Sequence, residues 1–75
     1  MKITIESTSQ IVHVNGVEAR IWEGATEAGV PVFAFLTRIV PVTGDLEAHR
    51  VFKTELMKTK APSAAVEGIP LRLVL

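Results

Sequence analysis

The sequence contains no cysteine and only two histidines among its 75 residues. Without cysteine, neither a disulfide nor a thiolate zinc site can stabilise the chain. His13 and His49 are too few ligands for a closed structural zinc site, and pairing His13 with Glu18 would supply only two ligands from one face. We therefore expect no metal site and no cofactor.

An excess of charge of one sign is also missing, because eight basic residues balance eight acidic ones. Nucleic-acid-binding proteins usually carry a basic excess, so the zero net charge disfavours that class for the whole chain. No apolar run approaches the roughly 18 residues of a membrane-spanning helix. Residues 1–6 lack the continuous apolar segment of a signal peptide. We expect a cytoplasmic protein with no membrane partner.

Catalytic motifs are absent as well. The sequence has no glycine-rich phosphate loop ending in Lys-Ser or Lys-Thr and no G-x-G-x-x-G motif. Its nearest candidate, residues 24–29, is accompanied by Glu23 and Glu27, which would repel phosphate. The serines lie in turn-like contexts without a base or an oxyanion site, and no carboxylate pair is expected to be buried. We expect that the chain is not an enzyme.

Aliphatic side chains are abundant. Hydrophobic residues make up 48% of the chain, and aromatic residues only 5%. A chain this short buries only about 60% of the surface that its unfolded form exposes, so the monomer should be marginally stable. Because disulfides and metals are excluded, self-association is the remaining route to stability. The sequence predicts a single domain over residues 1–75 that forms a homo-oligomer, with a dimer as the favoured state.

The clearest local signal is the dipeptide Asn15-Gly16 between two apolar segments. It predicts a β-hairpin with a type I′ turn, because Asn and Gly tolerate positive φ at both central positions. The turn fixes the register, with His13 opposite Glu18 and Ile11 opposite Arg20. Each face of the hairpin then has its own set of residues: Val12, Val14, Val17, Ala19 and Ile21 on the core face, and Ile11, His13, Glu18, Arg20 and Trp22 on the outer face.

Further strands are predicted on both sides of the hairpin. Residues 2–6 alternate like a short, half-buried strand, and residues 7–10 are polar and predict a turn. Residues 23–29 contain two glycines and predict a loop. The apolar segment 30–40 predicts a long strand. Its apolar residues do not alternate cleanly, so we expect a helix on one face and a second subunit on the other.

One main helix is predicted in the second half of the chain. Asp45 is a favourable N-cap, residues 46–60 favour a helix, and Pro62 ends it. A short helical turn over residues 64–67 and a strand over residues 69–75 follow. The predicted fold class is α+β. It is a small antiparallel or mixed sheet made of a short first strand, the hairpin, the long strand and the final strand, with one helix packed on one face.

Two groups of side chains outside the expected core could form a binding surface. On the outer face of the hairpin, Trp22 joins Ile11 and Arg20, as is typical of interfaces, unless a loop or the C-terminal segment covers it. The other group is a basic strip on the helix, which Arg38 could join and whose alternative is an ordinary solvated face. The strip consists of Leu46, His49, Arg50, Lys53, Met57 and Lys60.

Several short segments carry structural motifs without chemistry. They are MKITIESTS (1–9), VNGV (14–17), RIWEG (20–24), LTRI (36–39), APS (61–63) and IPLRLVL (69–75). Together they resemble segments of small bacteriophage- and prophage-encoded proteins. That group has no settled activity, so the resemblance assigns no functional residues. It implies that the chain acts by binding: blocking a host defence complex, sequestering a signalling nucleotide or modifying a host regulator by contact.

The sequence therefore favours a non-enzymatic phage or prophage accessory protein that contacts a host protein or protein complex. The most specific version of this prediction is that the chain inhibits a host immune complex. One alternative is a sponge that binds a phosphorylated signalling nucleotide at a subunit interface, with Arg50, Lys53 and Arg38 on the phosphates and Trp22 or a phenylalanine on the base. Another is a minor structural component of a phage particle. The predicted binding residues are Trp22, Arg20, Ile11, Arg38, His49, Arg50 and Lys53.

Overall fold

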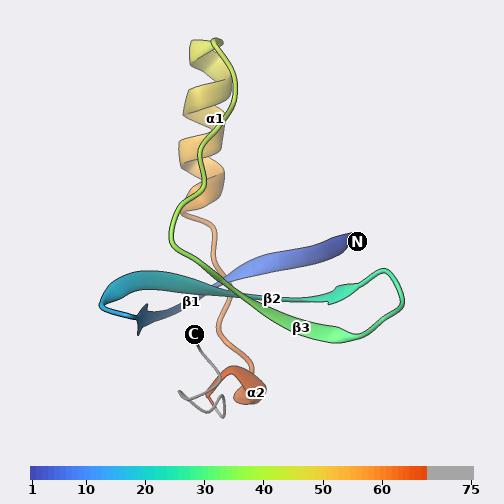
Figure 1. The fold of residues 1–75 in the computed structure, drawn as a ribbon. Coiled ribbons are helices and arrows are strands. Elements are labelled where there is room, and N and C mark those ends of the chain that lie inside the picture. Colours follow the sequence, from blue (N-terminus) through green and yellow to red (C-terminus); the bar gives the residue numbers. More distant parts are fainter. Residues whose placement is uncertain (68–75) are drawn as a thin grey trace.

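The computed structural model describes residues 1–67, and its centre is a three-stranded antiparallel sheet in the order β1-β2-β3 (Figure 1). The strands are β1 (Ile3–Val14), β2 (Val17–Thr26) and β3 (Pro31–Leu36), and the helices are α1 (Leu46–Leu56) and α2 (Ala64–Glu67). The predicted α+β class is thus confirmed. The strand predicted over residues 69–75 lies outside the described residues.

The hairpin between β1 and β2 has the predicted turn and register. Asn15 and Gly16 adopt φ values of 52° and 81°, the left-handed conformation that a type I′ turn requires. The pairing runs as predicted, from Val14 opposite Val17 to Ile11 opposite Arg20. Local backbone chemistry at two residues therefore determines which side chains share a face of the sheet.

β1 is one continuous strand, so the turn predicted at residues 7–10 is wrong. The register shifts between Ser7 and Ile11, where residues 8–10 lie opposite Ile21 alone and form a bulge. Thr8 is fully buried there, and its hydroxyl donates a hydrogen bond of 2.7 Å to the carbonyl oxygen of Ile21. A polar segment can remain in the sheet because its buried side chain has a hydrogen-bond partner.

β2 continues through residues 23–26, where a loop was predicted. Gly24 is paired with Ile5, and a Cβ atom on it would overlap the carbonyl oxygen of Thr4 and lie 2.7 Å from the Cα of Ile5. Gly24 therefore permits close approach of two strands and does not mark a loop. The actual turn lies between Thr26 and Pro31 and includes Gly29, with φ of 85°.

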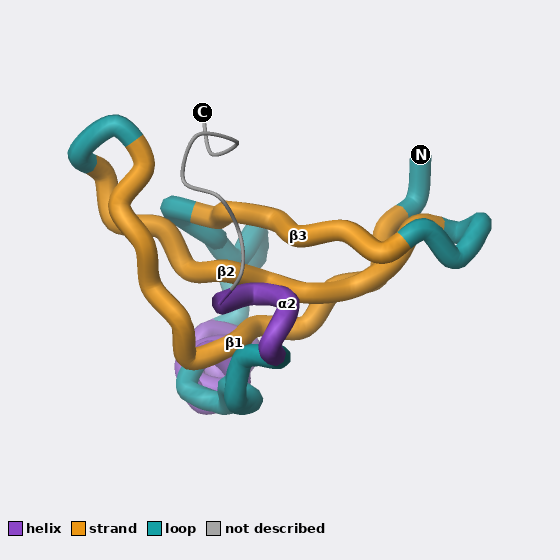
Figure 2. The backbone as a smooth tube through the Cα atoms, turned by 90° about the horizontal axis from the view of Figure 1, so that it is seen from below, coloured by secondary structure: helices purple, strands orange, loops and turns teal. Residues whose placement is uncertain are grey.

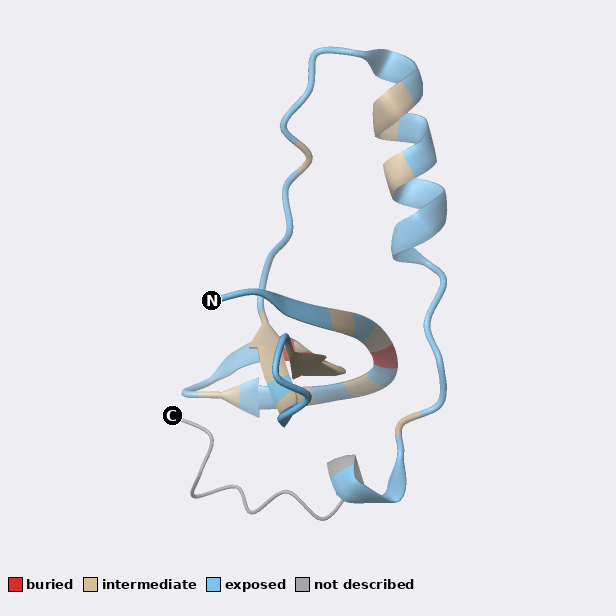
Figure 3. Cartoon of the chain, turned by 90° about the vertical axis from the view of Figure 1, so that its right-hand side faces the viewer, coloured by how far each residue is buried: buried red, intermediate tan, exposed pale blue. Residues whose placement is uncertain are grey.

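β3 ends at Leu36, so the long strand predicted over residues 30–40 is only partly confirmed. Beyond Leu36 the chain leaves the sheet and reaches Pro41, which has no N–H group to donate to a neighbouring strand. Residues 37–57 project from the sheet as an arm, in which an extended leg leads out and α1 leads back (Figures 1 and 3). The Nε2 of His49 lies 2.8 Å from the carbonyl oxygen of Thr43 and joins the two halves of the arm.

α1 does not pack its face on the sheet, contrary to the prediction, and none of its residues is buried. The predicted N-cap is confirmed, since Asp45 Oδ1 accepts a hydrogen bond of 3.0 Å from the N–H of Glu47. The helix ends at Leu56 rather than at Lys60 because Lys60 bonds to β1 instead. Its N–H donates to the carbonyl oxygen of Ser7 at 3.1 Å, and its carbonyl oxygen accepts from the N–H of Ser9 at 2.9 Å.

α1 and α2 lie on opposite sides of the sheet (Figures 1 and 2). Of the predicted core face, Ala19 and Ile21 are each only 2% exposed, whereas Val17 is 53% exposed because it lies next to the hairpin turn. Thr8 is the remaining buried residue of the described chain. The core is therefore confined to the centre of β2 and the bulge of β1 (Figure 3).

Replacing Gly24 with alanine should destabilise the fold, because the added methyl group meets backbone atoms of β1 that cannot move away as a flexible side chain could. We expect a loss of about 1–3 kcal/mol in the free energy of unfolding, the usual cost of overpacking. Urea denaturation followed by circular dichroism measures it.

Gly44→Ala is the matched control, since nothing lies within 4 Å of a Cβ built at Gly44. Its free energy of unfolding should stay within about 0.5 kcal/mol of the original chain. Equal unfolding midpoints for the two variants would contradict the close approach at Gly24.

Candidate functional site

A pocket of about 360 Å³ lies where the ends of β3 and α1 meet the outer face of β2. This volume falls within the usual range for small-molecule sites, about 300–1,000 Å³. Trp22, Arg20, Ile11 and Arg38, four of the predicted binding residues, contribute to its wall. The remaining lining residues are Glu18, Ala19, Leu36, Thr37, Ile39 and Leu56.

The sheet register explains why these side chains meet. Ile11 and Leu36 flank Arg20 on the two neighbouring strands, so the three lie in one row across the sheet. Trp22 follows Arg20 by two residues in β2 and therefore points to the same face. Arg38 follows the last residue of β3 by two positions and also lines the pocket. The hairpin between β1 and β2 thus supplies half of the lining residues.

Arg20 is held in place by the bulge of β1. Its Nη1 donates a hydrogen bond of 2.8 Å to the carbonyl oxygen of Thr8, and the residue is half-buried. A guanidinium group has five N–H donors in a rigid plane, so one anchored N–H leaves others for an incoming acceptor. The sequence does not predict this hydrogen bond, because its acceptor is a backbone carbonyl oxygen that only the bulge makes accessible.

The three predicted binding residues of the helix, His49, Arg50 and Lys53, are not brought to the pocket. His49 contacts Thr43, and the Arg50 Nη1 lies 3.5 Å from Glu47 Oε2 one turn earlier, with both side chains more than 60% exposed (78% and 64%). Lys53 lies in the last turn of α1, where its charge favourably meets the helix dipole. The predicted basic strip is also shorter than expected, because Lys60 lies beyond the helix.

Leu56 is the last residue of α1, and hydrogen bonds between the segment that follows it and β1 hold it at the pocket. Immediately beyond the helix, the hydroxyl of Ser7 donates to the carbonyl oxygen of Lys58 at 3.1 Å. Lys60 then forms a parallel bridge with Thr8, so this segment borders β1 like a short fourth strand. The end of the arm is therefore attached to the sheet through backbone groups of the bulge.

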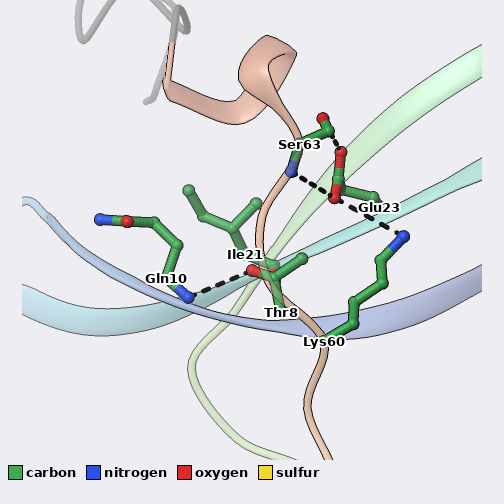
Figure 4. Close-up of polar contacts among 6 residues, drawn as sticks. All are labelled: Thr8, Gln10, Ile21, Glu23, Lys60 and Ser63. Atoms are coloured by element: carbon green, nitrogen blue, oxygen red, sulfur yellow. Dashed lines mark hydrogen bonds and ion pairs between the residues drawn. The ribbon is translucent and has the colours of Figure 1, made fainter.

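Three polar residues complete this attachment, and we call Glu23, Lys60 and Ser63 the clasp (Figure 4). The carboxylate of Glu23 accepts hydrogen bonds from the hydroxyl and, at 3.2 Å, from the N–H of Ser63. Lys60 Nζ lies 3.6 Å from Glu23 Oε2. The sequence predicts Glu23 in a loop and does not reveal the clasp, because Glu23 and Ser63 are 40 residues apart.

The clasp lowers the pKa of Glu23. The hydrogen bond from the Ser63 hydroxyl is the main cause, while partial burial of the carboxylate opposes it, and the Ser63 N–H and the charge of Lys60 add to the lowering. A carboxyl with a lowered pKa in the folded state stabilises the fold above its ordinary pKa. That contribution is lost as the pH falls through the lowered value.

Within residues 1–67, no group of three or more His, Cys, Asp or Glu side chains is placed to hold a metal ion. The polar side chains at the pocket are those of Arg20, Arg38, Glu18 and Thr37, which suit binding of a charged group. In this same part of the chain, no helix has the length and apolar character needed to cross a bilayer.

Ser63→Ala should raise the pKa of Glu23 toward its ordinary value, because the variant removes the main hydrogen bond to the carboxylate. Carbon-detected NMR of the Glu23 carboxyl across an acid titration measures this pKa. Ser9→Ala is the control, since Ser9 is exposed and bonds to Lys60 through its backbone N–H, which the substitution leaves in place. A Glu23 pKa that is the same in both variants would contradict the clasp.

Comparison of the chain with protein-family models, with curated proteins and with solved structures finds no match. The resemblance to small bacteriophage and prophage proteins therefore stays a prediction.

Proposed function

We propose that this chain is a non-enzymatic binding protein that acts through protein–protein contact and is assembled as a homodimer. The observation that carries the proposal is the imbalance between its surface and its core. In the described residues, the buried apolar core consists of Ala19 and Ile21. So small a core does not by itself offset the conformational entropy lost on folding, so a second copy would supply the missing burial.

The exposed area supports an interface of ordinary size. The chain exposes 5942 Å², whereas a compact monomer of this length exposes about 4,500 Å². The excess of roughly 1,400 Å² is larger than the about 800 Å² that each partner buries in a standard protein–protein interface. The radius of gyration points the same way: it is 13.8 Å, against about 11 Å for a compact domain of this length.

The arm carries many of the exposed large apolar side chains of the described residues. Apolar side chains are exposed on both its leg and its helix, and the most exposed are Val42 at 98%, Leu46 at 84% and Met57 at 85%. A solvated monomer rarely presents so many large apolar side chains on one projection. A second copy is the occupant that fits best, because the formal net charge is zero and two identical arms can meet about a two-fold axis.

Sedimentation equilibrium at micromolar concentration should therefore give the mass of a dimer. Val51→Asp, on the exposed apolar side of α1, should weaken the dimer at least tenfold, about 1.4 kcal/mol, because it buries a charge at the interface. Thr4→Asp adds the same charge at an exposed polar position of β1, away from the arm, and should leave the dimer intact. A folded monomer at every concentration would overturn the homodimer.

The narrower form of the proposal is that the chain contacts and inhibits a host immune complex in the cytoplasm of a bacterial cell. The resemblance of its short segments to phage and prophage proteins supports this form, and so does a surface suited to contact rather than catalysis.

Expression of the chain in bacteria that carry a defence complex should raise phage plating on those cells at least tenfold. Cells that express the Val51→Asp variant are the matched control, and they should plate phage less efficiently if the dimer is the active form. Unchanged plating across a panel of strains with different defence complexes would count against the inhibitor, without bearing on the homodimer.

A further inference from the structure

We propose that the pocket beside Trp22 binds a nucleoside monophosphate, with its base against Trp22 and its phosphate between Arg20 and Arg38. This inference goes beyond the proposed homodimer, because the pocket is built by one chain. It gives the chain a small-molecule ligand in addition to a protein partner.

The positive end of the pocket is formed by two arginines, one anchored by a hydrogen bond and one exposed. Arg20 is half-buried and anchored through Nη1 to the carbonyl oxygen of Thr8, so its remaining N–H groups are already oriented. Arg38 is exposed and has no ion-pair partner within residues 1–67. A fixed guanidinium beside a free one suits an oxyanion with several acceptor oxygens, such as a phosphate monoester.

The rest of the wall suits a flat apolar group. Trp22 is half-buried, so its ring is held in place while one part stays accessible. Ile11, Leu36 and Leu56 line the same space. An aromatic ring beside aliphatic side chains is a surface on which a nucleobase stacks without any requirement for one particular base.

Glu18 completes the site and narrows the class of ligand. Its carboxylate lies on the same face as Arg20, one alternation along β2, and it forms no ion pair in the described part of the chain. A carboxylate beside the two guanidinium groups lowers the attraction for any phosphate, so two arginines alone do not make a strong site for inorganic phosphate. Binding then also requires the contact of a base with Trp22, which a nucleotide supplies and inorganic phosphate does not.

The single tryptophan makes the site directly measurable. Adenosine, guanosine, cytidine and uridine monophosphates are titrated into the intact chain with excitation at 295 nm, and free N-acetyltryptophanamide corrects for absorption by the ligand. At least one nucleotide should quench the Trp22 emission in a saturable way. Adenosine alone and inorganic phosphate alone should bind at least tenfold more weakly.

Two arginine variants locate the phosphate. Arg38→Gln should weaken nucleotide binding at least tenfold, whereas Arg50→Gln, which removes the same charge from an exposed arginine outside the pocket, should change it less than twofold. Shifts of the Trp22 indole N–H signal in NMR spectra provide a second readout. Absence of saturable binding by every nucleotide, or equal losses in both variants, would overturn the proposal.

The same titration is independent of the homodimer. Repeated with the Val51→Asp variant, it should give the same affinity, because the side chain of Val51 is not part of the pocket wall. Nucleotide binding that disappears together with the dimer would contradict a pocket built by one chain.

Discussion

The hydroxyl of Thr8 donates its hydrogen bond to Ile21 in the middle of the sheet, and the rest of the structure is organised around that contact. The side chain of Thr8 points into the core at the bulge of β1. The backbone and hydroxyl groups of residues 7–9 are then available for hydrogen bonds to residues outside β1. The carbonyl oxygen of Thr8 holds Arg20 at the pocket, while Ser7 and Ser9 hold the chain that returns from the arm. A single satisfied polar group thus links the core, the pocket and the attachment of the arm.

Features determined by neighbouring residues could be predicted from the sequence. The turn at Asn15-Gly16, the register that follows from it and the N-cap at Asp45 are set by backbone chemistry within a few residues. The same register explains why Trp22, Arg20 and Ile11 were correctly grouped on one face. Their gathering into a pocket with Arg38 required in addition the path of the chain after β3.

Features determined by distant residues could not be predicted. The polar residues 7–10 resemble a turn until Ile21 and Lys60 provide their partners. Gly24 resembles a loop residue until the backbone of Thr4 is placed beside it. The helix is predicted to pack on the sheet because the apolar face of the sheet has to be buried against another element. The sequence does not say whether that cover belongs to the same chain. This is why it predicts His49, Arg50 and Lys53 beside the sheet surface, whereas the structure places them on the arm.

The hydrogen bond from Ser7 to Lys58 joins residues 51 positions apart, whereas the hairpin joins near neighbours. Closing so long a loop costs chain entropy before any contact compensates for it, and this cost grows with the logarithm of loop length. The hairpin is therefore expected to form early in folding, and the return of the arm to the bulge late. By the same reasoning, we expect the arm to detach before the hairpin separates when the chain unfolds. The chain then passes through states in which the hairpin is intact while the backbone groups of the β1 bulge are free to pair with another strand.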